Sequence, residues 1–168
     1  MIGFTKTAIA VLSILGAVTA APTAADTEID YLSVIEVGPG FPTPQELGLT
    51  NADLSKPIPA SIVSRDLLSK RAPAACWGNP KCHVNDARAC FNYLQGLGGR
   101  RCEPSNGRVQ MCKIGGCAWD ARGTRGSSCS DAALGGAWVL NNCNGGGWVA
   151  GTNAAFGNGD MIVDVIGR

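Results

Sequence analysis

The chain has 168 residues and a formal net charge of +1, with eight cysteines, four tryptophans and a single histidine. A net charge this close to zero excludes the strongly basic balance of a nucleic-acid-binding protein, and no recognition motif for nucleic acid is present. We therefore expect no nucleic-acid partner.

The N-terminal 20 residues have the layout of a secretory signal peptide. Lys6 is followed by an uncharged apolar run over residues 8–18 and then by small residues up to Ala20. This order predicts a signal peptide at residues 1–20 that is cleaved near Ala20. The run of about 11 residues is shorter than the roughly 20 that a membrane-spanning helix needs. We expect a secreted, extracellular product that is not integral to a membrane.

Residues 21–71 differ in composition from the rest of the chain. They contain several prolines, no cysteine and no tryptophan, and their net charge is −3, against +3 for residues 72–168. Such a composition predicts a pro-segment that is mostly disordered, because it offers little apolar surface to bury. The segment ends in the dibasic pair Lys70 and Arg71, which predicts a cleavage site. The alternative is a solvated linker in which the pair occurs by chance.

All eight cysteines follow this dibasic pair. They are Cys76, Cys82, Cys90, Cys102, Cys112, Cys117, Cys129 and Cys143. Eight cysteines in a secreted domain of about 97 residues predict four disulfides, each contributing about 2–4 kcal/mol to stability. Their connectivity stays open, since eight cysteines allow 105 pairings. A zinc site is disfavoured, because no C-x-x-C pair occurs and His83 is the only histidine.

The first half of residues 72–168 predicts a helix and a hairpin. Apolar spacing predicts a helix that Asp86 caps and that ends at Gly98 and Gly99. Residues 108–114 and 117–121 predict two strands joined by a glycine turn at residues 115–116. Because side chains alternate along a strand, two faces are expected. The core face holds Cys112, Ile114, Cys117 and Trp119, and the open face holds Val109, Met111, Lys113, Ala118 and Asp120.

The second half repeats this order. A helix capped by Ser130 or Asp131 is expected to run to Cys143, and residues 147–156 and 161–167 are expected to form a hairpin around a turn at residues 157–160. We expect its two glycines, Gly135 and Gly136, to give room for close packing against the sheet. The order helix, two strands, helix, two strands predicts a small, disulfide-rich α+β sandwich. Two helices would cover one face of an antiparallel sheet.

These segments carry a family resemblance. CWGNPKC, DARACFNYLQGLGG, RVQMCKIGGCAW and GGWVAGTNAAFGNGDMIVDVIG resemble fungal secreted proteins related to the smut-virus killer toxins and to necrosis-inducing plant-pathogen effectors, the killer-toxin-like effector superfamily. The resemblance covers nearly all of residues 76–167. It implies an α/β sandwich, no cofactor, and action on a competitor or host cell, with calcium channels as the target of some toxins. The killer toxins place a functional lysine where this chain has Gln110, and the nearest bases are Arg108 and Lys113.

Catalysis is not expected from the remaining polar residues. A nucleophile and base arrangement must use His83, which lies beside a disulfide cysteine in an expected loop. A glycosidase needs two carboxylates that flank a cleft. We interpret Asp86 and Asp131 as helix caps, Asp160 as a turn residue, and Asp120 and Asp164 as residues on the surface of strands, so we expect no enzyme.

The candidate target-binding residues are basic and aromatic. They are Arg100, Arg101, Arg108, Lys113, Trp77 and Trp148, and the expected partner is a cell-surface or membrane protein bound by a monomer. Arg122 and Arg125 carry further positive charge, and the simpler reading of all these bases is a solvated loop. Trp119 and Trp138 fall on expected core faces. One alternative is a module that binds chitin or glucan in the cell wall. Another is a protease inhibitor that presents Arg108 from a loop at residues 103–108.

The change in composition after Arg71 gives a first prediction. The secreted form is expected to begin at Ala72 and to contain four disulfides, so intact mass spectrometry of the unreduced protein should report both features at once. A secreted species that retains residues 26–71, in a strain with normal dibasic processing, would contradict the assigned cleavage site.

Overall fold

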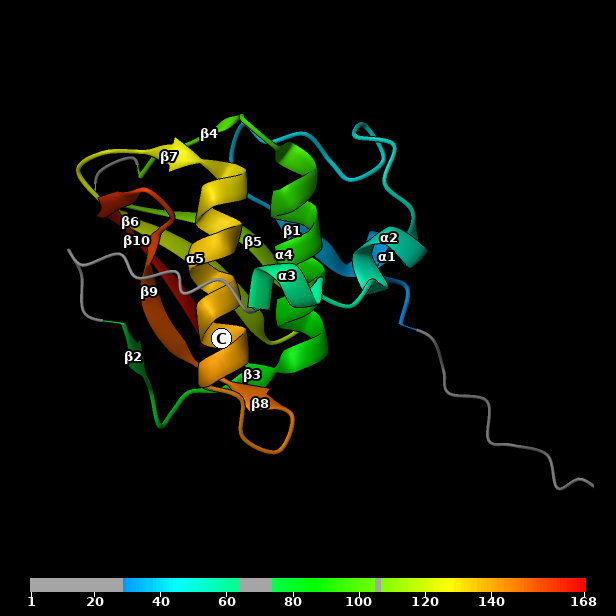
Figure 1. The fold of residues 1–168 in the computed structure, drawn as a ribbon. Coiled ribbons are helices and arrows are strands. Elements are labelled where there is room, and N and C mark those ends of the chain that lie inside the picture. The colour runs from blue at the N-terminus through cyan, green and yellow to red at the C-terminus, as the bar shows by residue number, and fades with distance from the viewer. Residues whose placement is uncertain (1–28, 64–73, 105–106) are drawn as a thin grey trace, which may run out of the picture.

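The computed structural model describes residues 29–63, 74–104 and 107–168 (Figure 1). Two long helices, α4 (Val84–Leu97) and α5 (Cys129–Asn142), lie side by side on one face of a six-stranded sheet. Every strand pairing in this sheet is antiparallel. The predicted fold class, a disulfide-rich α+β sandwich with two helices on one face of the sheet, is confirmed.

The main sheet joins strands from both ends of the described chain. In spatial order its strands are β1 (Ile35–Val37), β5 (Arg108–Ile114), β6 (Cys117–Gly123), β10 (Asn158–Gly167), β9 (Gly151–Ala155) and β2 (Ala75–Cys76). Two small ribbons complete the domain. They are β3 (Cys82–His83) with β8 (Trp148–Val149), and β4 (Arg101–Cys102) with β7 (Ser127–Ser128).

The central hairpin has the predicted turn and register. Ile114 lies opposite Cys117 and Cys112 opposite Trp119, and all four side chains are buried in the core. Gly115 adopts a positive φ of 52° in the turn, a conformation that glycine reaches without steric cost. Strand β6 continues to Gly123, two residues beyond the predicted end, because it pairs with β10 over its whole length.

A β-bulge in β5 overturns part of the predicted face assignment. The register shifts between Gln110 and Cys112, so Met111 is an extra residue on its strand. A bulge of this kind reverses the facing of every residue before it. Val109 and Met111 were expected on the open face and are instead buried in the core. Arg108 and Gln110 turn to the open face in their place.

Helix boundaries differ from the predicted ones at their N-terminal ends. The N-cap of α4 is His83, whose Nδ1 accepts a hydrogen bond from the backbone N–H of Asn85, and Asp86 lies inside the first turn. The N-cap of α5 is Ser128, whose hydroxyl accepts from the N–H of Asp131, so neither Ser130 nor Asp131 caps the helix. Each cap is the last residue of a short strand, β3 or β7, so the end of that strand sets where the helix begins.

The C-terminal hairpin is tighter than predicted. Strands β9 and β10 are joined at Phe156 and Gly157, so Asp160 is a strand residue and not part of a four-residue turn. The expected first strand is also divided, because Trp148 and Val149 pair with β3 and only residues 151–155 join the main sheet.

All eight cysteines are paired, as predicted. The disulfides are Cys76–Cys143, Cys82–Cys117, Cys90–Cys112 and Cys102–Cys129. The third joins the middle of α4 to β5, and the first and fourth hold the two ends of α5 against β2 and β4. A domain with this many disulfides is typical of an extracellular compartment.

The N-terminal segment is folded where it was expected to be disordered. Residues 29–63 form α1 (Tyr31–Val34), β1, α2 (Asn51–Ser55) and α3 (Ala60–Val63). Leu54 is completely buried and Tyr31 nearly so. The prediction was wrong because it judged the segment alone, whereas in the structure α2 packs against α4 and against α1, and α3 packs against α5. Ala20, Lys70 and Arg71 lie outside the described residues, so both cleavage sites stay predictions.

The packing of α5 on the sheet depends on its glycines, as expected. A Cβ at Gly136 would overlap the buried ring of Trp119, and one at Gly135 would overlap the Ala154 carbonyl oxygen. Glycine inside a helix costs up to about 1 kcal/mol relative to alanine. The close approach of helix and sheet offsets that cost, since a fully buried tryptophan fills the space.

Substitution of Gly136 tests this packing. Gly136→Val should lower the free energy of unfolding by about 2 kcal/mol, because the added methyl groups have no space beside Trp119. Urea unfolding of the unreduced protein gives the measurement. Gly99→Val is the matched control, because a Cβ there meets no atom, and it should stay within about 0.5 kcal/mol of the parent. Equal losses in both variants would show that Gly136 is not packed as described.

Candidate functional site

The open face of the sheet carries a pair of buried carboxylates. Asp120 on β6 lies directly opposite Asp164 on β10. Side chains alternate along a strand, and the neighbouring Trp119 lies against Gly136 of α5, so Asp120 is on the face away from the helices. Their exposed fractions are 1% and 2%, so the interpretation of both as residues on the surface of strands is wrong. Like charges placed directly opposite each other on adjacent strands destabilise a sheet unless cations neutralise them.

Three guanidinium groups supply that neutralisation. Arg108 donates to Asp120 Oδ2 from Nε and Nη2, at 3.1 and 2.9 Å, and Arg168 donates to the same oxygen. Arg122 Nε donates to Asp164 Oδ2 at 2.9 Å. Each guanidinium-bearing side chain keeps between 40% and 49% of its surface exposed. The carboxylates are therefore covered, and the cations form the accessible part of the cluster.

The same network links the strands of the sheet. Thr152 on β9 donates its hydroxyl hydrogen to Asp164 Oδ1 at 2.7 Å. Arg108 Nη2 also lies 3.5 Å from Asp164 Oδ2, so this side chain contacts carboxylates from two strands. Asp120 Oδ1 is buried with no hydrogen-bond partner, which leaves Asp120 dependent on the two arginines at its other oxygen.

Lys113 lies on the open face, as predicted, but it is covered. Its side chain is only 27% exposed, and Nζ lies 3.0 Å from Glu36 Oε1 on strand β1. The expectation of a freely exposed lysine is wrong in the chain as described, because the N-terminal segment supplies its partner. We define the basic face as the side chains of Arg108, Lys113, Arg122 and Arg168.

Two predicted bases do not join this basic face. Arg101 lies in the ribbon of β4 and β7 near the start of α5, where its guanidinium pairs with Glu103. Arg100 is the residue just before β4, and its carbonyl accepts the N–H of Cys129. Arg168, in contrast, was missed. It follows β10 directly, and only the pairing of that strand with β6 shows that it lies near Asp120.

Arg108 is not presented from a loop. It is the first residue of β5, and two carboxylates bind its guanidinium group. An inhibitor that presents Arg108 to a protease would need this side chain to extend freely from the surface, and here it is paired with two carboxylates instead.

Three of the four tryptophans lie where they were expected, Trp119 and Trp138 in the core and Trp148 at the surface. Trp119 is fully buried and Trp138 packs partly against the core. Trp148 on β8 is 51% exposed, and its ring meets His83 edge-on with centroids 5.6 Å apart. Trp77 is half-buried, and its backbone N–H donates to the Ala150 carbonyl oxygen.

Asp86, in the first turn of α4, is a titratable group outside the basic face. Partial burial raises the pKa of the Asp86 carboxyl above its usual range, and the charge of His83 opposes that shift. Among the residues that the structure describes, no group of three His, Cys, Asp or Glu side chains is placed to hold a metal ion. Over the same residues, no helix is long and apolar enough to cross a bilayer.

A family model for a domain of unknown function, DUF8794, matches residues 71–167. The chain therefore belongs to the DUF8794 family. No curated protein and no solved structure matches the chain. The matched region contains every disulfide and the whole basic face except Arg168, and it begins at the second residue of the predicted dibasic site.

The role of the guanidinium groups can be tested by removing the two that bind Asp120. Arg108→Ala and Arg168→Ala should each lower the free energy of unfolding by about 1 kcal/mol, because one cation remains. Together they should cost about 3 kcal/mol or more, since a buried carboxylate is left unpaired. Non-reducing urea unfolding measures these values.

Two further variants separate charge from packing. Asp120→Asn in the double variant should recover part of the loss, because no buried charge is left to neutralise. Arg125→Ala is the control, since Arg125 is highly exposed and its nearest carboxylate oxygen is 3.8 Å away. Additive losses without recovery would show that the arginines stabilise the sheet by packing alone.

Proposed function

We propose that residues 72–168 form a secreted, non-enzymatic toxin or effector domain that binds a surface target on a competitor or host cell through its basic face. The observation that carries this proposal is the arrangement of the open sheet face. Its carboxylates are buried and its cations are partly exposed, on a scaffold that four disulfides hold in place. A rigid surface of one charge sign attracts an acidic partner.

The surroundings of the acidic residues support a binding role over hydrolysis. Asp120 and Asp164 lie beneath guanidinium groups, so neither can reach a glycosidic oxygen. His83 Nδ1 accepts a backbone hydrogen bond at the start of α4. The neighbouring Cys82 forms a disulfide with Cys117, so it offers no thiolate that His83 could activate. The resemblance to killer toxins and necrosis-inducing effectors points to the same class of action.

Binding to cell-wall polysaccharide is a second candidate, and one observation favours it. Trp148 exposes half of its surface beside His83, and an exposed indole ring stacks on sugar rings. In a pull-down on insoluble chitin and glucan, retention of the parent and loss of retention in Trp148→Ala would support this function in place of the first.

The primary proposal predicts a specific loss of activity. In the mature form, Lys113→Ala should need about ten times more protein to cause growth arrest or necrosis in sensitive fungal or plant cells. Lys113→Arg should restore activity because it keeps the charge. The effect should weaken with added salt, since screening at 0.15 M acts over about 8 Å.

The matched control is Arg125→Ala, which removes one exposed charge outside the basic face. It should match the parent in the same cell assay. Equal activity of Lys113→Ala and the parent at low salt would rule out this residue as a target contact. Catalytic turnover of a cell-wall glycan by the purified domain would overturn the non-enzymatic assignment.

A further inference from the structure

The N-terminal segment covers one edge of the main sheet. Strand β1 pairs antiparallel with β5, with Ile35 opposite Ile114, Glu36 opposite Lys113 and Val37 opposite Cys112. The next residue extends this pairing, since Gly38 N–H donates to the Met111 carbonyl oxygen at 3.0 Å. A Cβ at Gly38 would overlap the Gln110 carbonyl oxygen, so the two backbones approach as closely as glycine allows.

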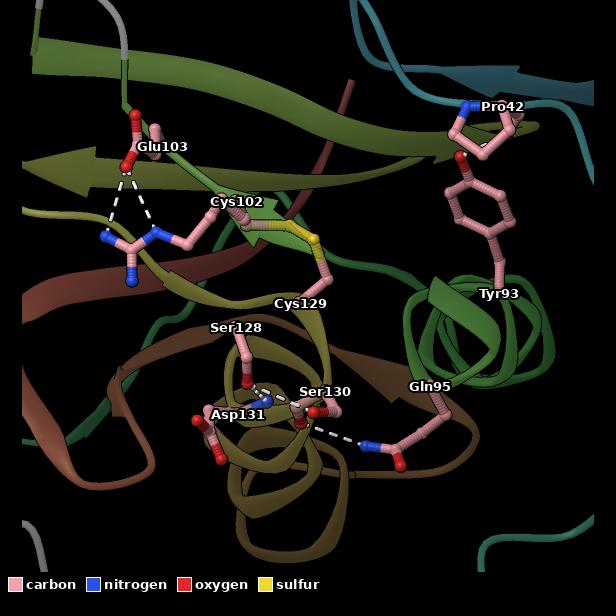
Figure 2. Close-up of a disulfide and its surroundings, with 10 residues drawn as sticks. Pro42, Tyr93, Gln95, Cys102, Glu103, Ser128, Cys129, Ser130 and Asp131 are labelled. Carbon is pink, nitrogen blue, oxygen red and sulfur yellow. Dashed lines mark hydrogen bonds and ion pairs between the residues drawn. A yellow bond between two sulfur atoms is a disulfide. The ribbon is translucent and has the colours of Figure 1, made fainter. Parts of the chain in front are cut away.

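The same segment also binds the outer side of α4. Tyr93 donates its hydroxyl hydrogen to the Pro42 carbonyl oxygen at 2.7 Å (Figure 2). Asn92 Nδ2 donates to the carbonyl oxygens of Leu54 and Lys56, at 2.7 and 2.9 Å. Burial raises the pKa of the Tyr93 phenol, as expected for a hydroxyl enclosed by the segment. Removal of the segment would leave these groups, and the β5 edge, without their present partners.

The covering segment lies outside the domain that the family model matches. That match begins at Arg71, whereas β1 and α2 end at Val37 and Ser55. The seven-residue strand β5 is therefore an edge strand of the family domain, and β1 is an addition to it. A long uncovered edge is a template for pairing with another chain.

We propose that the β5 edge and Lys113 form a strand-docking surface, which residues 29–63 occupy until the chain is cut at the dibasic site. Its partner is an extended protein segment with an acidic side chain opposite Lys113 and an aliphatic side chain on each side. This inference rests on the proposed function, because it names the partner chemistry of the same basic face.

The physical demands of the edge define that partner. The free N–H and C=O groups of β5 need main-chain groups as partners, which a peptide strand supplies and a sugar or lipid headgroup does not. Strand alternation places Glu36 toward Lys113 while Ile35 and Val37 pack against the core. A competing strand with the same order of side chains would supply the main-chain hydrogen bonds, the acidic group opposite Lys113 and the two aliphatic side chains that pack on the core.

The experiment starts from the purified full chain. One sample is cut with a dibasic protease, and a Lys70→Ala/Arg71→Ala chain is the uncut control. The probe is a fluorescent synthetic peptide of residues 29–63, followed by fluorescence anisotropy. The cut chain should bind the probe, whereas the uncut chain should bind it at least ten times more weakly because its own segment holds the edge. Equal binding by both chains would overturn the proposal.

Charge reversal tests the register. A probe with Glu36→Lys should bind the cut parent at least about five times more weakly. The cut Lys113→Glu chain should bind this probe within about twofold of the original pair. Asp30→Lys in the probe is the control, because the Asp30 side chain makes no capping hydrogen bond. Equal weakening by both reversals would overturn the assigned contact.

A short competitor and a cell assay complete the design. A peptide of residues 33–39 should displace the probe, and failure to do so at millimolar concentration would overturn strand docking. If the probe binds as expected while the cut chain is inert on sensitive cells, the proposed toxin function fails and the docking surface stands. If the cut and uncut chains are equally active on cells, the surface is not the one that the target uses, and the proposal is overturned.

Discussion

The rest of the structure depends on four disulfides that fix two helices on one face of the sheet. A domain of about 97 residues buries too little apolar surface for a large core, so covalent links replace part of the missing packing energy. Cys90–Cys112 joins α4 to β5, and Cys102–Cys129 joins the start of α5 to β4. With both helices held on one side, the opposite face has no need to be apolar. That face carries the buried carboxylates and the basic residues.

Patterns that act within a few residues could be read from the sequence. Local spacing and turn chemistry predicted the glycine turn, the register that places Cys112 opposite Trp119, and both long helices. The bulge at Met111 was missed although the sequence carries a signal for it. Polar and apolar residues alternate along residues 108–114 except at the adjacent apolar pair Met111 and Cys112, and this break marks the extra residue of the bulge. Its consequence for the site is large. Without the bulge, Arg108 would face the helices, and Asp120 would lose both hydrogen bonds that Arg108 donates to its Oδ2.

Contacts between residues far apart in the sequence could not be predicted from local patterns. Arg168 binds Asp120 because β10 pairs with β6, and no local pattern connects the two residues. The N-terminal segment was misjudged for a related reason. It contains several prolines and no cysteine or tryptophan, but it also carries large apolar side chains such as Leu54 and Tyr31, and α4 and neighbouring elements provide a surface that buries them. Composition describes what a segment can bury by itself and omits what another part of the chain can cover.

The partners of the four cations differ in a way that bears on function. Arg108, Arg122 and Arg168 bind carboxylates of the domain itself, so their charges are offset wherever the domain goes. Lys113 binds Glu36, which belongs to the segment before the dibasic site. Cleavage followed by loss of that segment would therefore change the charge balance of the basic face at Lys113 alone. It would free the adjoining edge of β5 in the same step, because Glu36 and the strand that covers β5 are parts of one element. In the proposed scheme, a single cut would therefore expose a positive charge and open a strand edge together, so that one acidic, extended partner could use both.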